Sequence, residues 1–336
     1  MKVGIVGVGF MGTAHAEAWA ATDAELVGFA AETTDAAGSL ASLYGKQIFS
    51  DLDAMLPHVD VVDICTPTHL HYDMVLQAAA AGKHVICEKP LARTVAHSRL
   101  MVDACREAGV RLLVGHVVRF FPQYAAARQA VVDGQIGKPG VLRLTRCSYR
   151  PKKPVGNWFL DEARSGGILM DLMIHDYDYA RWVAGDVETV FARKIASAHP
   201  DASVDYALAI LTHKNGAISH IAGGWAYPPP TFRTALEIAG DAGLIQFDSQ
   251  ETAPIQNFIA KSGAADSPDV AIPSSPVSES PYTTQIKEFY AALQSGSPAR
   301  VSPEDGLAAV QIAQAAIYSD ESGTAVRPDQ FVELQS

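Results

Sequence analysis

A short apolar run followed by three glycines constrains the fold of this chain more than any other feature. Val3 to Val8 is continuously apolar, as expected of a strand covered on both faces, and helical spacing follows to about Ala21. In a strand–loop–helix of this kind, the first glycine of Gly-x-Gly-x-x-Gly permits a tight turn, the second lets the backbone approach a pyrophosphate, and the third lets helix and strand pack closely. The helix N-terminus also presents free N–H groups to phosphate. The loop therefore predicts dinucleotide binding by Gly7, Gly9, Phe10, Met11 and Gly12.

Short strand patterns alternate with helical patterns as far as residue 120, and this alternation predicts a parallel sheet with crossover helices. Two of the helices end at a glycine, Gly82 and Gly109, just past their last turn. The predicted strands are Val3–Val8, Leu26–Ala31, Val59–Cys65, His84–Cys87 and Arg111–Val114, and the helices between them include His71–Ala81 and Val95–Ala108.

The pattern changes near residue 138. The turn signals Lys214-Asn215-Gly216 and Asp241-Ala242-Gly243 each predict a hairpin, and strands joined by tight turns are antiparallel. The predicted elements are strands Val141–Tyr149, Val187–Ser197, Tyr206–Thr212 and Ala217–Gly223, helices at about Ser165–Ala184, 283–294 and 303–317, and an irregular excursion over residues 250–281. We expect an α/β fold: an N-terminal Rossmann domain with a doubly wound parallel sheet in residues 1–120, and an α+β domain with a large, mostly antiparallel open sheet in residues 121–336, whose C-terminal helices pack back on the first domain.

The end of the second predicted strand bears on which dinucleotide binds. An acidic residue is expected about 20 residues after the glycine loop, to bond the adenosine ribose. Ala31 stands at the expected position and Glu32 follows it. The Glu32 carboxylate can reach the ribose hydroxyls and would repel a 2′-phosphate, so the sequence favours NAD and leaves NADP open.

Composition excludes several other classes of protein. A formal net charge of −11 without a basic run argues against a nucleic-acid partner. No apolar stretch has the length needed to cross a bilayer, and the glycine-broken N-terminus does not resemble a secretion signal. Because the four cysteines lack metal-ligand spacing, we expect reduced structural thiols in a cytoplasmic protein. These cysteines are Cys65, Cys87, Cys105 and Cys147.

Further motifs resemble those of the glucose–fructose oxidoreductase / inositol dehydrogenase / MocA family. The resemblance runs nearly from end to end, and the combination of Glu-Lys-Pro with Gly-Gly-x₃-Asp-x₃-His is specific. The motifs are Thr66-Pro67-Thr68-His69-Leu70-His71, Cys87-Glu88-Lys89-Pro90-Leu91, Gly115-His116 with Arg119-Phe120, Gly166-Gly167 to Asp171 and His175, and Ser319-Asp320-Glu321-Ser322-Gly323.

The resemblance implies hydride exchange between NAD(P) and a secondary hydroxyl, usually of a sugar, polyol or related cyclic compound. It also implies that Lys89, Asp171 and His175 are catalytic. The chemistry of these side chains agrees, because a histidine titrates near neutrality and can take up the hydroxyl proton. Asp171 and His175 lie four residues apart on one predicted helix, so we expect them on one face, with the carboxylate orienting the imidazole or bonding a neighbouring substrate hydroxyl. The Lys89 ammonium would stabilise a developing alkoxide.

Other candidate contacts complete the predicted site. Thr68 stands where the family often has asparagine and is not among the predicted cofactor contacts. His71, His116, His213 and His220 are interpreted as structural or solvated. A metal site is not expected, because Asp176 and Asp178 point away from His175 around the helix. The predicted cofactor contacts outside the glycine loop are Glu32, Thr66, Pro67, His69, Glu88 and Lys89, and the predicted substrate contacts are Lys89, Arg119, Tyr149, Trp158, Asp171 and His175.

Three functions remain in competition. The first is a sugar or polyol dehydrogenase, and the second retains NAD and uses transient oxidation for epimerisation or glycoside cleavage. The third is a regulator that binds dinucleotide without turnover, which need not keep the catalytic trio that this chain has. In each case we expect a homodimer or homotetramer formed through the open face of the second sheet.

Overall fold

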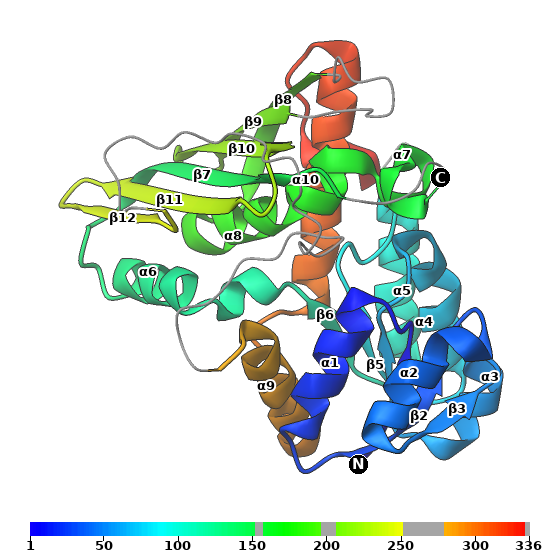
Figure 1. The fold of residues 1–336 in the computed structure, drawn as a ribbon. Coiled ribbons are helices and arrows are strands. Elements are labelled where there is room, and N and C mark those ends of the chain that lie inside the picture. Colours follow the sequence, from blue (N-terminus) through cyan, green and yellow to red (C-terminus); the bar gives the residue numbers. More distant parts are fainter. Residues whose placement is uncertain (152–156, 196–205, 251–278, 333–336) are drawn as a thin grey trace. The chain divides into compact units, whose positions relative to one another are not determined.

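The computed structural model describes residues 1–151, 157–195, 206–250 and 279–332 (Figure 1). Contacts divide the chain into two compact units. Unit 1 comprises Met1–Phe120 and Val277–Ala308, and unit 2 comprises Phe121–Pro276 and Ala309–Ser336. Within the described residues, no helix combines the length and the apolar character needed to span a bilayer.

Unit 1 contains a six-stranded sheet in the order β3-β2-β1-β4-β5-β6, and every neighbouring pair is parallel. This order is that of a doubly wound dinucleotide-binding sheet, so the predicted Rossmann fold is confirmed. Its strands are β1 (Lys2–Val6), β2 (Glu25–Ala30), β3 (Gln47–Phe49), β4 (Val61–Ile64), β5 (His84–Glu88) and β6 (Leu112–Gly115). Its helices are α1 (Phe10–Ala20), α2 (Thr34–Tyr44), α3 (Leu52–Met55), α4 (His71–Ala80), α5 (Val95–Glu107) and α9 (Pro281–Ser295).

The predicted first strand ends two residues too late. The chain leaves β1 after Val6 because Gly7 adopts a left-handed backbone with φ 96°, which a side chain would disfavour. The sequence prediction also did not specify β3, a three-residue edge strand, or α2 before it. A strand of three residues shows too little alternation to be recognised from hydrophobic periodicity.

Unit 2 contains a second six-stranded sheet, in the order β12-β11-β7-β10-β9-β8. Both predicted hairpins are confirmed, since β9 pairs with β10 and β11 pairs with β12, in each case antiparallel. The pair β7–β10 is parallel, which makes the sheet mixed. Its strands are β7 (Pro139–Tyr149), β8 (Val187–Ile195), β9 (Tyr206–His213), β10 (Ile218–Tyr227), β11 (Phe232–Gly240) and β12 (Leu244–Asp248).

The predicted continuous helix over about Ser165–Ala184 is wrong. The structure has a short helix α7 (Glu162–Ser165), a π-helical segment over Ile168–Leu172, and then α8 (Ile174–Ala184). The break has a local cause, because Gly166 and Gly167 both have positive φ angles, 91° and 62°, which no right-handed helix contains.

One face of the second sheet is packed and the other is open. Helix α8 contacts β7 and β10, and α6 (Pro122–Val132) contacts α8 (Figure 1). Alternate residues of β9 confirm the two faces, since Ala207, Ala209 and Leu211 are buried whereas Leu208 and Ile210 are exposed. The last long helix, α10 (Pro303–Ser322), begins in unit 1 and ends in unit 2. Residues 251–278 of the predicted irregular excursion, and the last two residues of the predicted strand Val187–Ser197, lie outside the described residues.

Candidate functional site

Four neighbouring strands of the first sheet are each followed by a residue that belongs to one of the sequence motifs. Gly7 follows β1, Thr66 lies beyond the end of β4, Lys89 follows β5 and His116 follows β6. Because β1, β4, β5 and β6 are parallel neighbours, these strand ends share one edge of the sheet. Ligands bind open α/β sheets outside the carboxyl ends of their strands, at the point where the strand order reverses, which here lies between β1 and β4.

The glycine loop has the geometry that a pyrophosphate requires. Gly7 donates its N–H to Ala30 O at 2.8 Å, which joins the loop to the end of β2. A Cβ on Gly12 would lie 1.9 Å from Gly7 O, so only glycine permits this approach of helix to loop. A Cβ on Gly9 would meet no described atom within 4 Å, and Gly9 caps α1 without a side-chain hydrogen bond. The space beside the second glycine and the N–H groups at the start of α1 therefore fit a dinucleotide.

The other predicted cofactor residues lie around the same strand ends. Phe10, the first residue of α1, is exposed and Met11 is half-buried. Glu32 is exposed two residues after β2, as a group that bonds a ribose would be. Thr66, Pro67 and His69 are half-buried in the segment between β4 and α4. Their contacts with a cofactor stay predictions.

His71 was interpreted from sequence as structural or solvated, and it proves to connect two of these loops. Its ring is buried, with Nδ1 2.9 Å from Pro90 O and Nε2 3.0 Å from Thr66 O. Burial lowers the pKa of His71, although both carbonyl groups raise it, so the ring is neutral and donates to one carbonyl at a time. His71 thereby ties the Thr66 segment to the chain that leaves β5, and its place in the Thr66–His71 motif was the available sequence signal.

Lys89 lies half-buried directly after β5, and the Lys89-Pro90 peptide bond is cis. Its backbone N–H donates to Oε2 of the preceding residue, Glu88, at 3.2 Å. The Glu88 side chain is itself buried, so this hydrogen bond is shielded from water. The orientation of the backbone at Lys89 is thus coupled to a buried carboxylate.

Unit 2 carries Asp171 and His175. Asp171 lies in the π-helical segment and is buried, and His175 is half-buried in the first turn of α8. The two residues do not share one regular α-helix, because Asp171 lies in the π-helical segment and His175 in α8, so their common face stays a prediction. Single π turns inside helices are frequent at functional sites. The residue after His175 is anchored, since Asp176 accepts two hydrogen bonds from Arg146 of β7, at 2.8 and 3.0 Å, and both side chains are buried.

The remaining predicted substrate contacts differ in exposure. Arg119 is buried in unit 1, where Nη1 donates to Arg300 O at 2.9 Å and to Asp305 Oδ2 at 3.0 Å. This guanidinium therefore has a structural partner whether or not it contacts substrate. Tyr149 is buried at the end of β7, and Trp158 is half-buried in a short 3-10 turn of unit 2. Their roles toward substrate stay predictions.

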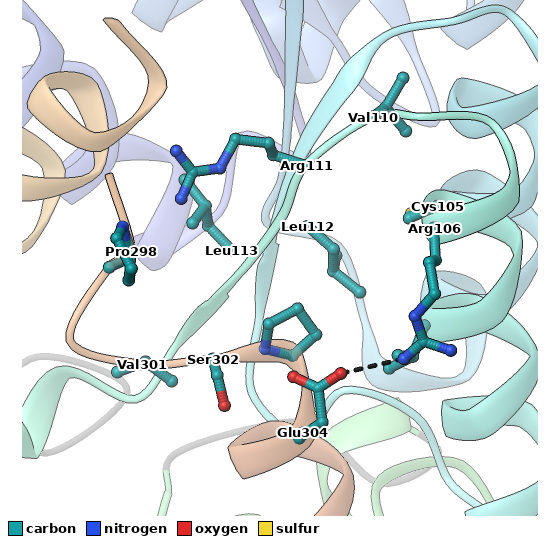
Figure 2. Close-up of a pocket in the computed structure, with 13 residues that line it drawn as sticks. Cys105, Arg106, Val110, Arg111, Leu112, Leu113, Pro298, Val301, Ser302 and Glu304 are labelled. Carbon is teal, nitrogen blue, oxygen red and sulfur yellow. Dashed lines mark hydrogen bonds and ion pairs between the residues drawn. The ribbon is translucent and has the colours of Figure 1, made fainter. Parts of the chain in front are cut away.

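A cavity of 290 Å³ in unit 1 lies away from the strand ends that carry the candidate site. It is formed by the end of α5, the start of β6 and the segment that leads into α10, and Figure 2 shows Arg106 reaching across it to Glu304. These Arg106 and Glu304 side chains are exposed and 3.0 Å apart. Because the cavity meets β6 at its amino end, it is not part of the candidate dinucleotide site.

Comparisons with known proteins agree with this geometry. Residues 1–116 match the oxidoreductase family with an NAD-binding Rossmann fold, GFO/IDH/MocA, and residues 124–246 match the GFO/IDH/MocA C-terminal domain. The chain is 32% identical to a myo-inositol 2-dehydrogenase of Thermotoga maritima, over 99% of this chain and 100% of the relative. It is 30% identical to an inositol 2-dehydrogenase of Rhizobium meliloti, over 95% of this chain and 96% of the relative.

A solved structure gives the same result in three dimensions. A levoglucosan dehydrogenase in complex with NADH and levoglucosan has a TM-score of 0.83 and 26% identity, and the match covers 97% of this chain and 99% of that one. Both halves of the chain, the sequence relatives and the fold therefore lead to one assignment. The chain belongs to the GFO/IDH/MocA family of oxidoreductases.

Proposed function

We propose that the protein is an NAD-dependent oxidoreductase that exchanges hydride with a secondary hydroxyl of a sugar, an inositol or a related polyol. The observation that carries this proposal is the glycine loop, whose open space at Gly9 fits a pyrophosphate, on a sheet whose adjacent strand ends hold Thr66 and Lys89. The relatives support the substrate class, since they are named as dehydrogenases of myo-inositol and levoglucosan.

We further propose that Lys89, Asp171 and His175 perform the proton chemistry. In the oxidising direction, the His175 imidazole takes the proton of the substrate hydroxyl. The Lys89 ammonium stabilises the negative charge that develops on that oxygen, which becomes the carbonyl oxygen of the product. Asp171 orients the imidazole or bonds a neighbouring hydroxyl. When bound, NAD supplies the acceptor for the hydride that leaves the carbon.

Glu32 supports NAD over NADP. Its carboxylate is exposed just after β2, where the adenosine ribose lies in a dinucleotide-binding sheet. A carboxylate there hydrogen-bonds the ribose hydroxyls and repels a 2′-phosphate.

The other two candidate functions are not favoured. A redox-neutral enzyme that retains NAD, or a regulator without turnover, would have the same fold and glycine loop. The sequence relatives described above are dehydrogenases by name, however, and the residues that the family resemblance makes catalytic are all present.

The proposal is tested with the purified protein, NAD or NADP, and a panel of inositols, hexoses, anhydrosugars and sugar acids. We expect reduced cofactor to accumulate with at least one polyol, and faster with NAD than with NADP. Preference for NADP would contradict the role of Glu32 while leaving the dehydrogenase intact. No reduced cofactor with any member of the panel would contradict the function itself.

We also propose that the protein works in the cytoplasm as a homodimer or homotetramer, assembled through the open face of the second sheet. Exposed apolar side chains gather there: Ile210 of β9 lies opposite Phe191 of β8, and Leu208 lies beside Ile210 on the same face. An exposed apolar patch of this kind is unfavourable in water and favours burial against another surface.

A charge on this face should separate the subunits. Leu208→Asp with Ile210→Asp would bury two carboxylates in the proposed interface, so we expect a monomer by light scattering where the wild type is an oligomer. Leu43→Asp, at an exposed leucine of unit 1, is the control and should leave the oligomer unchanged. A wild-type protein that is monomeric, or a double variant that still assembles, would refute this interface.

A further inference from the structure

A buried cluster of charged side chains lies behind Lys89, within unit 1. It consists of His15 from α1, Asp63 from β4 and Glu88 from β5, all nearly inaccessible to water. His15 Nδ1 lies 2.9 Å from Asp63 Oδ2, and His15 Nε2 lies 3.2 Å from Glu88 Oε1. The Trp19 indole N–H also donates to Asp63 Oδ2, at 2.7 Å. The proposed proton chemistry at Lys89, Asp171 and His175 uses neither His15 nor Asp63.

The arrangement favours a protonated His15. Each ring nitrogen of His15 faces a carboxylate oxygen; a neutral imidazole would turn the lone pair of one nitrogen toward one of these acceptors, whereas an imidazolium presents an N–H to both. Nδ1 makes the hydrogen bond to Asp63, whereas the approach of Nε2 to Glu88 is an ion pair without the alignment of a hydrogen bond. Burial lowers the pKa of His15, but the Asp63 carboxylate raises it, and the pKa ends well above its usual value.

Glu88 connects this cluster to Lys89. Its Oε1 faces His15, and its Oε2 accepts the backbone N–H of Lys89 at 3.2 Å. Gly115 of β6 leaves room for this carboxylate, since a Cβ on Gly115 would lie 2.5 Å from Glu88 Oε1. The two oxygens of one carboxylate therefore join His15 to the chain that carries Lys89.

Buried charges contribute little net stability to a protein core, because they lose their hydration on folding. Apolar side chains of similar volume are often at least as stabilising as buried ion pairs. We propose that His15 is a positioning residue for Lys89: as an imidazolium between Asp63 and Glu88 it fixes the Glu88 carboxylate, which orients the backbone of Lys89. This inference rests on the proposed catalytic role of Lys89.

A metal site is the competing interpretation, because one ligand atom each from His15, Asp63 and Cys65 lies within 4.8 Å of the others. The side chains are already engaged with one another, since Nδ1 of His15 and the Trp19 N–H both bond Asp63. Burial also raises the pKa of the Cys65 thiol to about 12, which disfavours the thiolate that would bind a metal. These contacts favour positioning over metal binding.

Two substitutions of His15 test the roles of its two ring nitrogens separately. In His15→Gln, the amide nitrogen stands near the position of Nε2 and keeps a donor toward Glu88. In His15→Asn, the amide nitrogen stands near the position of Nδ1, so the donor toward Asp63 is kept and that toward Glu88 is lost. His213→Asn is the matched control, because His213 is a buried histidine of unit 2 bonded to Gly185 O and Ser219 Oγ.

On the best substrate we expect His15→Asn to lower kcat by about 10- to 100-fold, as a small misplacement of a catalytic group does, with the Kd for NADH within about threefold of the wild type. His15→Gln should retain kcat within about fivefold, and His213→Asn within about twofold. In a Glu88→Ala background, His15→Asn should have little further effect on kcat, because its route to Lys89 is already gone. Equal kcat for His15→Asn and His213→Asn, or full additivity with Glu88→Ala, would overturn the proposal.

A second readout does not depend on turnover. After reductive ¹³C-methylation, the Lys89 dimethylamine signal is assigned by its loss in Lys89→Arg. We expect His15→Asn to shift this signal and His213→Asn to leave it in place. A Lys89 signal that does not shift in His15→Asn would overturn the positioning role. This outcome is independent of activity, so it can be told apart from a wild-type protein that oxidises no polyol, which would contradict the proposed function instead. Zinc in the purified wild type that is lost in both His15 variants would overturn the positioning role in favour of the metal site.

Discussion

Replacing Lys89 by methionine, or His175 by asparagine, should lower kcat for polyol oxidation by about 10²- to 10⁴-fold, the range typical of a lost general acid or base. Lys89→Met removes the cation that stabilises the developing negative charge while keeping an apolar stem of similar length. His175→Asn removes the group that takes the proton. For His175→Asn, affinity for NADH, measured by fluorescence, should stay within about threefold, because the predicted loss is in the chemistry rather than in cofactor binding.

Two control variants test whether the loss of kcat is specific to Lys89 and His175. Lys46→Met removes a positive charge from an exposed position of unit 1, and His213→Asn removes a buried histidine from unit 2. Both should keep kcat within about twofold. If Lys89→Met and His175→Asn retained wild-type kcat, the assignment of the catalytic residues would be wrong, whatever reaction the enzyme performs.

Alanine substitutions at two glycines of the same loop should have different effects, one on NADH affinity and the other on thermal stability. In Gly9→Ala the new Cβ meets no described atom of the protein, so the protein should unfold at the wild-type temperature. The same Cβ occupies space that the pyrophosphate needs, so the affinity for NADH should fall by at least about tenfold, or about 1.4 kcal/mol.

In Gly12→Ala the Cβ would lie 1.9 Å from Gly7 O, so helix and loop must separate. Forced overpacking of this kind costs typically about 1–3 kcal/mol, so the melting temperature should fall without any ligand. Thermal unfolding with and without NADH distinguishes the two variants, because a bound ligand raises the melting temperature of the native protein. A Gly9→Ala protein that NADH stabilises as well as the wild type would place the dinucleotide elsewhere.

Much of the first sheet could be predicted because its signals are local. Most of its parallel strands are short, largely apolar runs, and two of the helices between them end just before a glycine, α4 before Gly82 and α5 before Gly109. The position of Lys89 followed from the same reasoning, because a residue directly after a buried parallel strand lies at the ligand-binding edge of the sheet.

What could not be predicted depends on contacts between distant parts of the chain. The parallel pairing of β7 with β10 joins strands that are separated by two others in sequence, so no turn sequence predicts this pairing. The break before α8 depends on two consecutive glycines whose left-handed backbone could have been expected only at the end of a helix.

The cluster behind Lys89 is the clearest case. His15, Asp63 and Glu88 come from three elements and meet only in the folded sheet. In the sequence, His15 is one polar residue three places after Gly12, and Asp63 interrupts an otherwise apolar strand. A buried polar residue of this kind needs a partner, but the sequence does not say which one.

Net transfer of hydride from a polyol to NAD distinguishes the proposed dehydrogenase from an enzyme that retains its cofactor. The most direct measurement follows the absorbance of reduced nicotinamide while the protein acts on an inositol or sugar with excess NAD, and quantifies the carbonyl product in the same sample. A dehydrogenase predicts one equivalent of NADH for each equivalent of ketone formed. Conversion of substrate without accumulation of NADH would contradict the proposed dehydrogenase and identify an enzyme that retains its cofactor.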